Sequence, residues 1–411
     1  MAMDMLSDTG SHPLKGVGLK VSSFKCFGDE KAGFDEFLPI NIIIGRNNSG
    51  KSALVDAMYL CTTSGKSYVP GMHARSNRPF KVSISQRLDE ESLQRVFRPT
   101  ASGGGVPGSN HWIYGKQFVG QKLTRTYTSG WNIEIEEAPE FEHINGSNRR
   151  GYLQSLAQHA APPFSALTLV KISAERDVPS ETKGITDKIQ PNGVGTTDLI
   201  RRFINSDSLP RDLVEVDLLR DLNTVYKGDS RFDRIMCQED GNGTWEIFLR
   251  EENKGDIRLS QSGSSLKSIF IILSMLRLSH VMDKNLEWSK SILVIEEPEN
   301  NLHPALLRRL LTFLAEARDR HGFTLIITTH SPIGIDWSSR RPDSQIIHVL
   351  HDGSDAITRT ATSYLCNRKI LDDLDIRASE ILQANGVIWV EGPSDRIYLR
   401  RWLDLFSMVH W

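Results

Sequence analysis

Residues 45–52 fit the pattern G-x-x-x-x-G-K-[ST] at every fixed position. The apolar, β-branched run 42–44 predicts a strand before this segment, and the apolar spacing over 52–60 predicts a helix after it. Such a turn directs backbone N–H groups and the positive end of the helix dipole at one point. Polyphosphate suits that point, with Lys51 reaching the β- and γ-phosphates and Ser52 ligating Mg²⁺. The alternative is an ordinary glycine turn that contains Lys-Ser.

Paired carboxylates end a second apolar strand, predicted over 291–295. Phosphate chemistry that depends on Mg²⁺ needs such acids beside a phosphate loop. We expect Glu296 to hold the metal or its waters, and Glu297 to orient and deprotonate the attacking water. A buried strand that runs into an acidic surface turn would contain the same residues, and it is the alternative.

Two further segments carry side chains that could contact a γ-phosphate. Ser262 and Gly263 lie in a serine- and glycine-rich stretch before an apolar helix predicted over 269–278. They could form a second anion site, or they could be a plain helix N-cap. His330 ends a buried strand that begins at Thr324, and a histidine in that position is more often structural than catalytic. Its expected place beside the acidic strand favours a role near the γ-phosphate.

The order of these motifs resembles an ATP-binding-cassette (ABC) ATPase head, of the type found in the structural-maintenance-of-chromosomes (SMC) and recombination-repair groups. More narrowly, segments 45–52, 296–299 and 329–332 resemble the overcoming-lysogenization-defect (OLD) family. Proteins of that family join such a head to a C-terminal Toprim nuclease, and relatives serve in bacterial anti-phage systems such as Gabija. The resemblance covers residues 17–350, and over 60–260 it extends only to the general layout.

This resemblance implies ATP and Mg²⁺ as cofactors and a role for each matching residue. Glu296 would be the strand-end metal acid together with Ser52, Glu297 the catalytic base, and His330 the switch histidine. The signature around Ser262 departs from the usual Leu-Ser-Gly-Gly-Gln and would act on the nucleotide of a second subunit. The residues expected to bind nucleotide are Gly45, Asn47, Asn48, Ser49, Gly50, Lys51, Ser52, Ser262 and Gly263. The family's metal-contacting glutamine is left unassigned, with Gln86 as the one candidate considered.

A third motif lies near the end of the chain. The apolar run 387–390, followed by Glu391-Gly392-x-x-Asp395, resembles the opening of a Toprim fold, in which the glutamate joins a later Asp-x-Asp to hold metal. No Asp-x-Asp follows Glu391 in this sequence, and Asp373-Leu374-Asp375 lies upstream. We therefore expect an incomplete Toprim segment with an incomplete metal site at Glu391. Either the segment is truncated, or another polypeptide supplies the rest. The chain alone is then not expected to cut DNA. The alternative is a short strand followed by a helix that starts near Ser394.

Composition indicates a globular protein, but it does not indicate whether the partner is DNA. The chain has 411 residues, 39% hydrophobic and 24% charged, as expected of a globular protein with two or three domains. Lys and Arg total 49 against 51 Asp and Glu, so any DNA-binding surface must be local. The four cysteines form no C-x-x-C pair, which argues against a zinc site and against disulfides. With no signal peptide and no run of 18 apolar residues in the sequence, we expect a cytoplasmic protein without a membrane partner.

The elements that must position these motifs indicate an α/β fold. We expect an ABC-type P-loop head: a mixed sheet with the phosphate loop at its edge, an antiparallel β layer and a helical lobe. The expected elements are strands at 18–25, 80–85 and 123–136, a buried strand at 166–173, an irregular stretch at 137–166, helical spacing over 197–226, and a hairpin over 245–259. The expected domains are a flexible N-terminus (1–16), the ATPase domain (17–376) and the Toprim-like segment (377–411).

The motifs predict ATP binding and hydrolysis, and the resemblance implies a homodimer, or a higher oligomer, that gates a DNA-directed effector in anti-phage defence. One alternative is a DNA-repair or chromosome-organising ATPase. That group often carries a long coiled coil, and the sequence contains no sustained heptad repeat. The other alternative is a nucleotide-dependent scaffold that binds a separate effector protein. Glu297 argues against it, because a scaffold needs no water-activating base.

Overall fold

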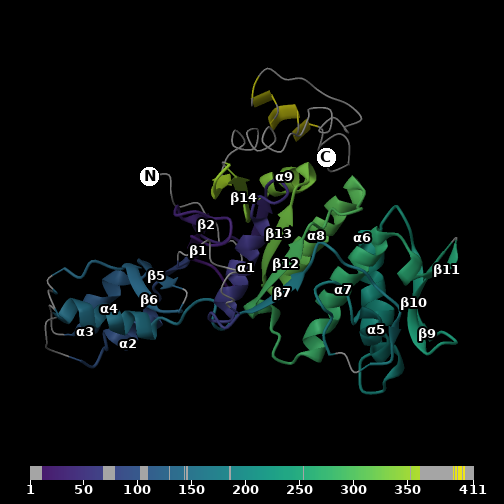
Figure 1. Ribbon diagram of the computed structural model, residues 1–411, viewed down its shortest axis with the longest axis horizontal. Coiled ribbons are helices and arrows are strands. Elements are labelled where there is room, and N and C mark those ends of the chain that lie inside the picture. The colour runs from purple at the N-terminus through teal and green to yellow at the C-terminus, as the bar shows by residue number, and fades with distance from the viewer. Residues whose placement is uncertain are drawn as a thin grey trace. The chain divides into compact units, whose positions relative to one another are not determined.

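The computed structural model divides the chain into two compact units, Met1–Asn367 and Arg368–Trp411 (Figure 1). The described residues are 12–67, 79–101, 110–361 without 129, 143, 145–146, 185–186, 253 and 352, and then 392, 394–395, 397–399 and 401–402. All elements named below belong to the first unit. The predicted boundary at 376/377 and the predicted strand before Glu391 lie outside the described residues and stay predictions.

A six-stranded mixed sheet carries the motifs, in the order β15-β14-β3-β13-β12-β7 (Figure 1). Neighbouring strands from β14 to β7 run parallel, and β15 pairs antiparallel with β14. In sheet order, the strands are Ala356–Ala361, Ser344–His351, Ile40–Ile44, Thr324–Thr329, Ser291–Glu296 and Thr168–Ile172. The phosphate-loop strand β3 is thus an interior strand, and its loop lies at the edge where the parallel strands end.

The strand predicted to be buried over 166–173 exists as β7, but that prediction of its burial was wrong. β7 is the edge strand of the sheet and pairs only with β12 among the described strands. Its residues are partly or fully exposed except Ile172. The apolar run therefore predicted the strand correctly, but the burial of that strand depended on its position in the sheet.

A five-stranded antiparallel sheet confirms the predicted β layer, with strand order β2-β1-β4-β5-β6. In that order the strands are Ala32–Phe34, Val17–Ser22, Lys81–Arg87, Lys122–Thr128 and Ile133–Glu137. The helix α1 (Lys51–Thr62) contributes Leu54, Met58 and Leu60 to one hydrophobic core shared by this sheet and one face of the mixed sheet. The start of α1, which carries the phosphate-loop lysine, is therefore anchored between two sheets.

A smaller core lies at the far end of the antiparallel sheet, and here the irregular stretch predicted over 137–166 was wrong in part. The helix α4 (Ser147–His159) buries Leu156 in this core, and Tyr152 and Leu153 pack against it. Its neighbours are α2 (Glu90–Val96), α3 (His111–Gly115) and the 3₁₀ turn η1 (Lys116–Phe118). The helix is mostly polar and contains a glycine, so its periodicity was weak.

The helical lobe predicted over 197–226 is confirmed as three segments, and the apolar helix predicted over 269–278 is confirmed as a longer helix after them. These are α5 (Thr196–Asn205), the π-helical turn η2 (Leu213–Leu218), α6 (Leu219–Val225) and α7 (Ser264–Met282). A small sheet accompanies them, formed by β8 (Glu181–Thr182), β9 (Phe232–Glu239), β10 (Thr244–Glu251) and β11 (Gly255–Arg258), with the 3₁₀ turn η3 (Leu259–Gln261) leading into α7. The predicted hairpin is β10–β11, and β9 was not predicted.

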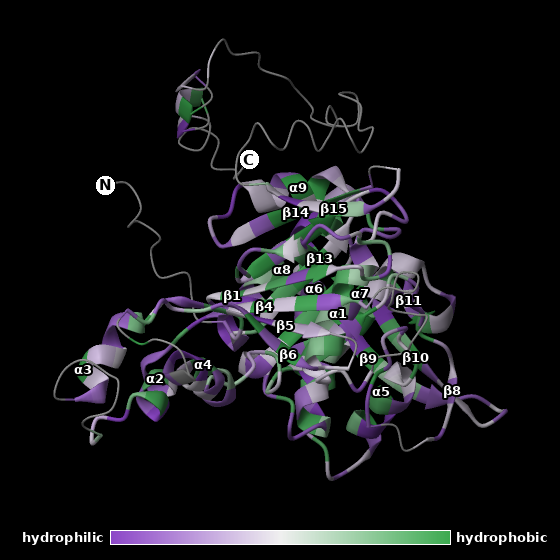
Figure 2. Cartoon of the chain, turned by 60° about the vertical axis from the view of Figure 1, so that its left-hand side comes forward, coloured by the Kyte–Doolittle hydropathy of each residue, from purple (hydrophilic) through white to green (hydrophobic). Residues whose placement is uncertain are grey.

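Two helices, α8 (Pro304–His321) and α9 (Pro332–Ser339), pack on the mixed sheet after the motif strands β12 and β13. The 3₁₀ turn η4 (Trp288–Lys290) precedes β12. Figure 2 shows hydrophobic residues gathered around β13, α8 and α9, while β8 and its neighbouring loops are hydrophilic. By length and composition alone, α7 could cross a membrane, although it contains Lys267 and Arg277 and forms no run of 18 apolar residues. Its middle, including Ile269, Phe270 and Leu273, is fully buried within the protein, as in a core helix.

Candidate nucleotide site

Three neighbouring parallel strands bring the principal motifs to one edge of the mixed sheet. Ile44 at the end of β3 pairs with Thr329 at the end of β13, and Thr328 pairs with Glu296 at the end of β12. The phosphate loop, His330 and Glu297 directly follow these paired residues. Since adjacent strands lie about 4.8 Å apart, the loop and the glutamate are separated by about 10 Å, which leaves room for phosphates between them.

The phosphate loop needs its two fixed glycines. Gly45 has φ 157°, and a Cβ there would collide with the carbonyl oxygen of Val349 and with the Ser49 side chain. Gly50 has φ 114° and precedes α1, and a Cβ there would lie 2.6 Å from the Sγ of Cys26. Any other residue at either position would be strained and crowded. The structure thus explains the motif glycines by backbone conformation and close packing.

Lys51 folds back over the loop that it follows. Its Nζ donates hydrogen bonds to the carbonyl oxygens of Gly45 (2.9 Å) and Arg46 (3.1 Å). Burial lowers the pKa of Lys51, and the opposing influence of Glu297, Glu299 and Glu296 does not cancel this effect. The carboxylates after β12 therefore act electrostatically on the lysine after β3, which joins the two motifs in one site.

The polar side chains around Lys51 differ in their exposure and in their hydrogen-bond partners. Ser49 is buried, and its Oγ has no hydrogen-bond partner within the described part of the chain. Ser52, in the first turn of α1, is exposed, as are Asn47 and Asn48. Asn48 has φ 62°, a left-handed conformation that asparagine tolerates. A buried hydroxyl without a partner costs free energy unless a bound group satisfies it.

Glu296, the predicted metal acid, is buried at the end of β12 and has a partner that the sequence did not suggest. One carboxylate oxygen, Oε2, lies 3.1 Å from the Nζ of Lys171 on β7. The other oxygen, Oε1, is buried without a hydrogen-bond partner among the described residues. Glu296 thus keeps one oxygen for a cation, while Lys171 offsets part of its charge.

Glu297, the predicted base, occupies a left-handed backbone conformation with φ 44°. Such a conformation is uncommon for a residue with a side chain and persists only when its surroundings hold it. Its N–H donates to the carbonyl oxygen of Thr328 (2.8 Å), and its Oε2 accepts from the Nδ2 of Asn300 (3.4 Å). The Nη2 of Arg176 donates to its carbonyl oxygen (3.1 Å). The Glu297 side chain is only partly exposed, so contacts with the protein, more than water, set the direction of its carboxylate.

His330 is held by Glu299, a residue to which the sequence motif assigned no role. The Oε1 of Glu299 accepts hydrogen bonds from the backbone N of His330 (2.8 Å) and from the Oγ1 of Thr329 (2.7 Å). The same oxygen lies 3.2 Å from the Nδ1 of His330, while Glu297 Oε1 lies 4.0 Å from that nitrogen. The ring is half exposed, and its Nε2 is left for a ligand. The position of Glu299 two residues after the base was the only sequence signal for this contact.

The signature residues lie at the start of α7. Ser262 donates from Oγ to the carbonyl oxygen of Leu259 (2.8 Å), and Gly263 precedes the first turn of the helix. Gly263 has φ −60°, and the nearest atom to a Cβ there would be Ser265 Oγ at 3.8 Å. Its own chain therefore does not require glycine at this position, in contrast to Gly45 and Gly50.

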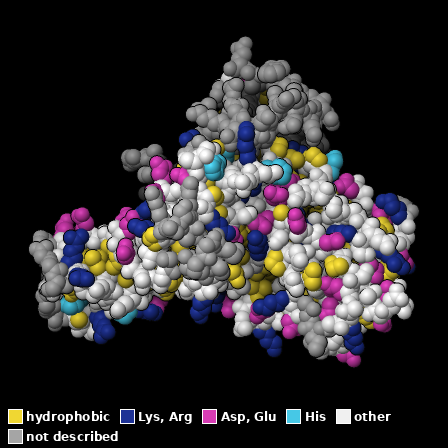
Figure 3. Space-filling model, viewed as in Figure 1, with side chains coloured by type: hydrophobic (Ala, Val, Ile, Leu, Met, Phe, Trp, Pro, Cys, Tyr) yellow, Lys and Arg dark blue, Asp and Glu magenta, His cyan; other side chains and the backbone are white. Residues whose placement is uncertain are grey.

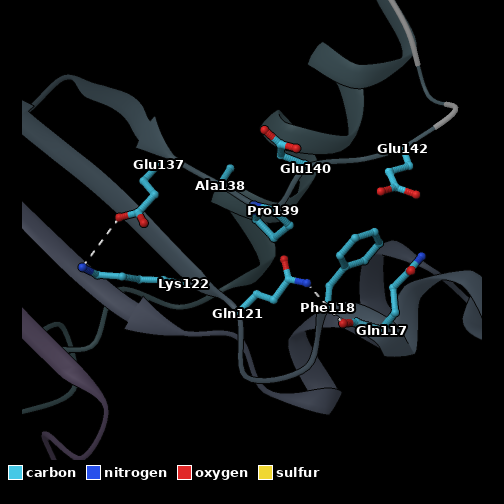
Figure 4. A pocket seen from close by; sticks show the side chains of 9 residues that line it. All are labelled: Gln117, Phe118, Gln121, Lys122, Glu137, Ala138, Pro139, Glu140 and Glu142. Atoms are coloured by element: carbon cyan, nitrogen blue, oxygen red, sulfur yellow. Dashed lines mark hydrogen bonds and ion pairs between the residues drawn. The ribbon is translucent and has the colours of Figure 1, made fainter.

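Other predicted residues and a pocket lie apart from this site. Gln86 is buried on β4 and accepts a hydrogen bond from Arg125 on β5, so it is engaged within the antiparallel sheet. Glu391 lies outside the described residues, so its predicted metal site stays a prediction. A pocket of about 440 Å³ near the β5–β6 hairpin is lined mainly by polar and acidic side chains, with Lys122 and Glu137 forming an ion pair (Figure 4). None of the motif residues lines it.

Comparisons with known proteins agree with the motif order. Residues 141–336 match the family described as "AAA domain, putative AbiEii toxin, Type IV TA system". Over 126 residues the chain is 29% identical to an OLD nuclease from Thermus scotoductus (strain ATCC 700910 / SA-01), a match that covers 28% of this chain and 22% of that nuclease. The chain thus matches about a fifth of the length of its curated relative.

Among solved structures, the chain is similar to SMC heads. An SMC head domain from Thermotoga maritima shows 14% identity and a TM-score of 0.41, covering 84% of this chain and 98% of that one. An SMC head with an extended coiled coil from Pyrococcus furiosus, bound to the C-terminal domain of ScpA, shows 13% identity and a TM-score of 0.45, covering 87% and 98%. The motifs on adjacent strands are those of an ABC-type ATPase, and the partial sequence match makes the chain similar to an OLD nuclease.

Proposed function

We propose that the chain binds ATP at the β3–α1 loop and hydrolyses it with Glu297 as the general base and His330 as the contact to the γ-phosphate. The observation that carries this proposal is the register of β3, β13 and β12, which supports a site with all three motifs at one sheet edge. Backbone N–H groups of the loop and the start of α1 suit the phosphates, and Lys51 can leave its two carbonyl partners to bind them.

Mg²⁺ fits the residues that the site offers. Among the described residues no group of three or more His, Cys, Asp or Glu side chains could hold a metal by itself. That suits Mg²⁺, which commonly binds through one or two protein oxygens together with phosphates and waters. The unpartnered Oε1 of Glu296 and the exposed hydroxyl of Ser52 are the protein oxygens we assign to it. When bound, the ion would neutralise part of the negative charge on the phosphates.

In the proposed reaction, the chain's own groups position and activate a water. Glu297 follows β12 and Lys51 follows β3, with β13 between these strands, so in the proposed site the carboxylate can orient a water in line with the γ-phosphate and accept its proton. The Nε2 of His330 is free to contact a γ-phosphate oxygen, while Nδ1 is occupied by Glu299. Arg176 donates to the backbone carbonyl oxygen of Glu297, and Asn300 donates to its carboxylate. Pre-set geometry of this kind is a large source of rate enhancement.

We further propose that two copies complete each site, and that ATP turnover gates a DNA-directed Toprim effector in cytoplasmic anti-phage defence. The open surroundings of Gly263 support a signature that receives the nucleotide of a second subunit. The similarity to an OLD nuclease and the toxin named in the matching family support a DNA-directed or otherwise harmful effector. On the face shown in Figure 3, basic and acidic side chains are interspersed, so that face offers no concentrated basic surface for DNA.

The test compares two single variants by ATP binding and by phosphate release. Lys51→Ala should abolish ATP binding, because the lysine is the loop's only cationic side chain besides the exposed Arg46. Glu297→Gln should bind ATP like the wild type and hydrolyse it about 10²–10⁴-fold more slowly, which is the usual contribution of a general base. Hydrolysis at the wild-type rate by Glu297→Gln would remove that residue from the catalytic role.

A further inference from the structure

The segment after β7 contacts the backbone of the catalytic acids. Arg176 donates from Nη1 to the carbonyl oxygens of Ser173 (2.7 Å) and Glu296 (2.8 Å). Its Nη2 donates to the carbonyl oxygen of Glu297 (3.1 Å). The planar guanidinium thus joins the end of β7 to the end of β12, across the point where Glu297 takes its left-handed conformation. These contacts fix the direction in which the Glu297 side chain leaves the backbone.

The next residue joins the same segment to the signature helix. The Oδ1 of Asp177 lies 2.8 Å from the Nζ of Lys267, which stands in the first turn of α7, four residues after Gly263. The two side chains of this ion pair differ in exposure, since that of Lys267 is 14% exposed and that of Asp177 is 64% exposed. The Oδ1 of Asp177 also accepts from the backbone N of Val178 (2.8 Å), which limits the rotation of the carboxylate.

A tight turn packs behind the segment and against α7. The backbone N of Asp177 donates to the carbonyl oxygen of Asn192 (2.9 Å). Gly193 has φ 93°, and a Cβ there would collide with the Asp177 carbonyl oxygen and lie 2.5 Å from the Cδ1 of Ile271 on α7. The backbone of residues 176–177 therefore cannot shift independently of α7.

We propose that Arg176 and Asp177 form a connector that couples the signature helix α7 to the orientation of Glu297. In this proposal, contact of Ser262 and Gly263 with the nucleotide of a second copy displaces the start of α7, and Lys267 then moves Asp177. The neighbouring Arg176 moves with Asp177 and reorients the carbonyl groups of Glu296 and Glu297. Arg176 and Asp177 are positioning residues, since neither touches the reacting atoms. This inference rests on the proposed ATP hydrolysis and adds the route by which the second copy controls it.

The connector predicts changes in turnover without changes in ATP affinity. Arg176→Lys keeps the charge but cannot reach three carbonyl oxygens at once, so kcat should fall about 10–100-fold, as expected for a misdirected catalytic group. Asp177→Asn should lower kcat by at most about fivefold, which is the range open to an exposed ion pair. In both variants the Kd of a fluorescent ATP analogue should stay within twofold of the wild type, because Lys51 and the loop are untouched.

Reversal of the ion pair separates coupling from simple packing. Asp177→Lys and Lys267→Asp should each lower kcat, and the double variant should recover most of the loss, because the attraction is restored with opposite signs. Asp256→Asn is the matched control: it breaks an exposed ion pair with Arg250 at 2.8 Å on the β10–β11 hairpin and should leave kcat unchanged. Arg125→Lys, which alters a buried arginine of the antiparallel sheet, controls for general destabilisation.

The outcomes distinguish the connector from the function on which it rests. Wild-type ATP hydrolysis no faster than that of Lys51→Ala would overturn the proposed function and the connector with it. An active wild type, with Arg176→Lys and Asp177→Asn at the wild-type kcat, would overturn the connector alone. If Arg176→Lys fails to fold, the reversal pair still decides, because Asp177 is largely exposed; a double variant no better than its single variants then refutes the coupling.

Discussion

Glu299→Gln tests whether the carboxylate two residues after the base holds the switch histidine in place. In the structure its Oε1 accepts from Thr329 Oγ1 at 2.7 Å and from the His330 backbone N at 2.8 Å. The substitution keeps the shape of the side chain and removes its charge. It also places an amide where Oε2 is now buried without a partner among the described residues. The histidine loop should therefore loosen while its surroundings remain packed.

The magnitude follows from the two hydrogen bonds. A hydrogen bond to a charged group contributes about 1.5–3 kcal/mol and a neutral one about 0.5–1.5 kcal/mol, so each bond loses about 1–1.5 kcal/mol. The two together lose about 2–3 kcal/mol, and if the loss falls entirely on the transition state, kcat falls about 30–150-fold. The additional contact of Oε1 with His330 Nδ1 acts in the same direction. ATP affinity should change little, since the phosphate loop is untouched.

The assay is steady-state phosphate release with ATP binding measured in parallel. Glu316→Gln is the control, an exposed glutamate on α8 that should leave kcat unchanged. In a His330→Ala background, Glu299→Gln should have almost no further effect on kcat, because the group that it positions is gone. A kcat within twofold of the wild type, or the full loss persisting without the histidine, would refute the assigned role.

Two further predictions concern assembly and acid stability. Chains carrying Lys51→Ala mixed with chains carrying Gly263→Trp should regain part of the ATPase, since one composite site of a mixed dimer is intact; a mixture as inactive as its parents, with both folded by circular dichroism, contradicts shared sites. Burial lowers the pKa of His12 to about 4. The unfolded chain therefore protonates the His12 imidazole from about pH 6.5 downward, whereas the native chain does so only near pH 4. The free energy of unfolding should then fall by about 2–3 kcal/mol between pH 7 and pH 4.5. Urea titrations should show a smaller fall for His12→Gln, and an equal fall would exclude His12 as the cause.

Much of the site could be predicted because its chemistry is local in the sequence. A phosphate loop needs its glycines, lysine and hydroxyl within eight residues, and an acid pair after an apolar strand is equally compact. The parallel strands β3, β13 and β12 then bring Gly45, His330 and Glu297 to one edge. That step follows from the rule that the carboxyl ends of parallel strands share an edge, so the residues could be assigned to one site before their strand order was known.

What could not be predicted depends on contacts between distant segments. Lys171 and Arg176 meet the acids only because β7 is the edge strand beside β12. Before the structure was known, the run 174–177 was simply a polar stretch after a strand. The helix α4 was missed for another reason, since a polar helix with few apolar positions folds by packing on the small core around Phe97 and Phe141 rather than by its own periodicity.

The catalytic base shows why a motif alone does not make a site. Glu297 follows the strand in a conformation that costs on the order of 1–3 kcal/mol, and its neighbours must offset that cost. They come from β13 (Thr328), from the turn before α8 (Asn300) and from the segment after β7 (Arg176). Loss of either backbone contact would let the backbone relax, and loss of the Asn300 contact would let the carboxylate rotate, in each case without altering the motif itself. The strength of catalysis should therefore follow the integrity of these three contacts, and of them only the contact through Arg176 also leads to the signature helix.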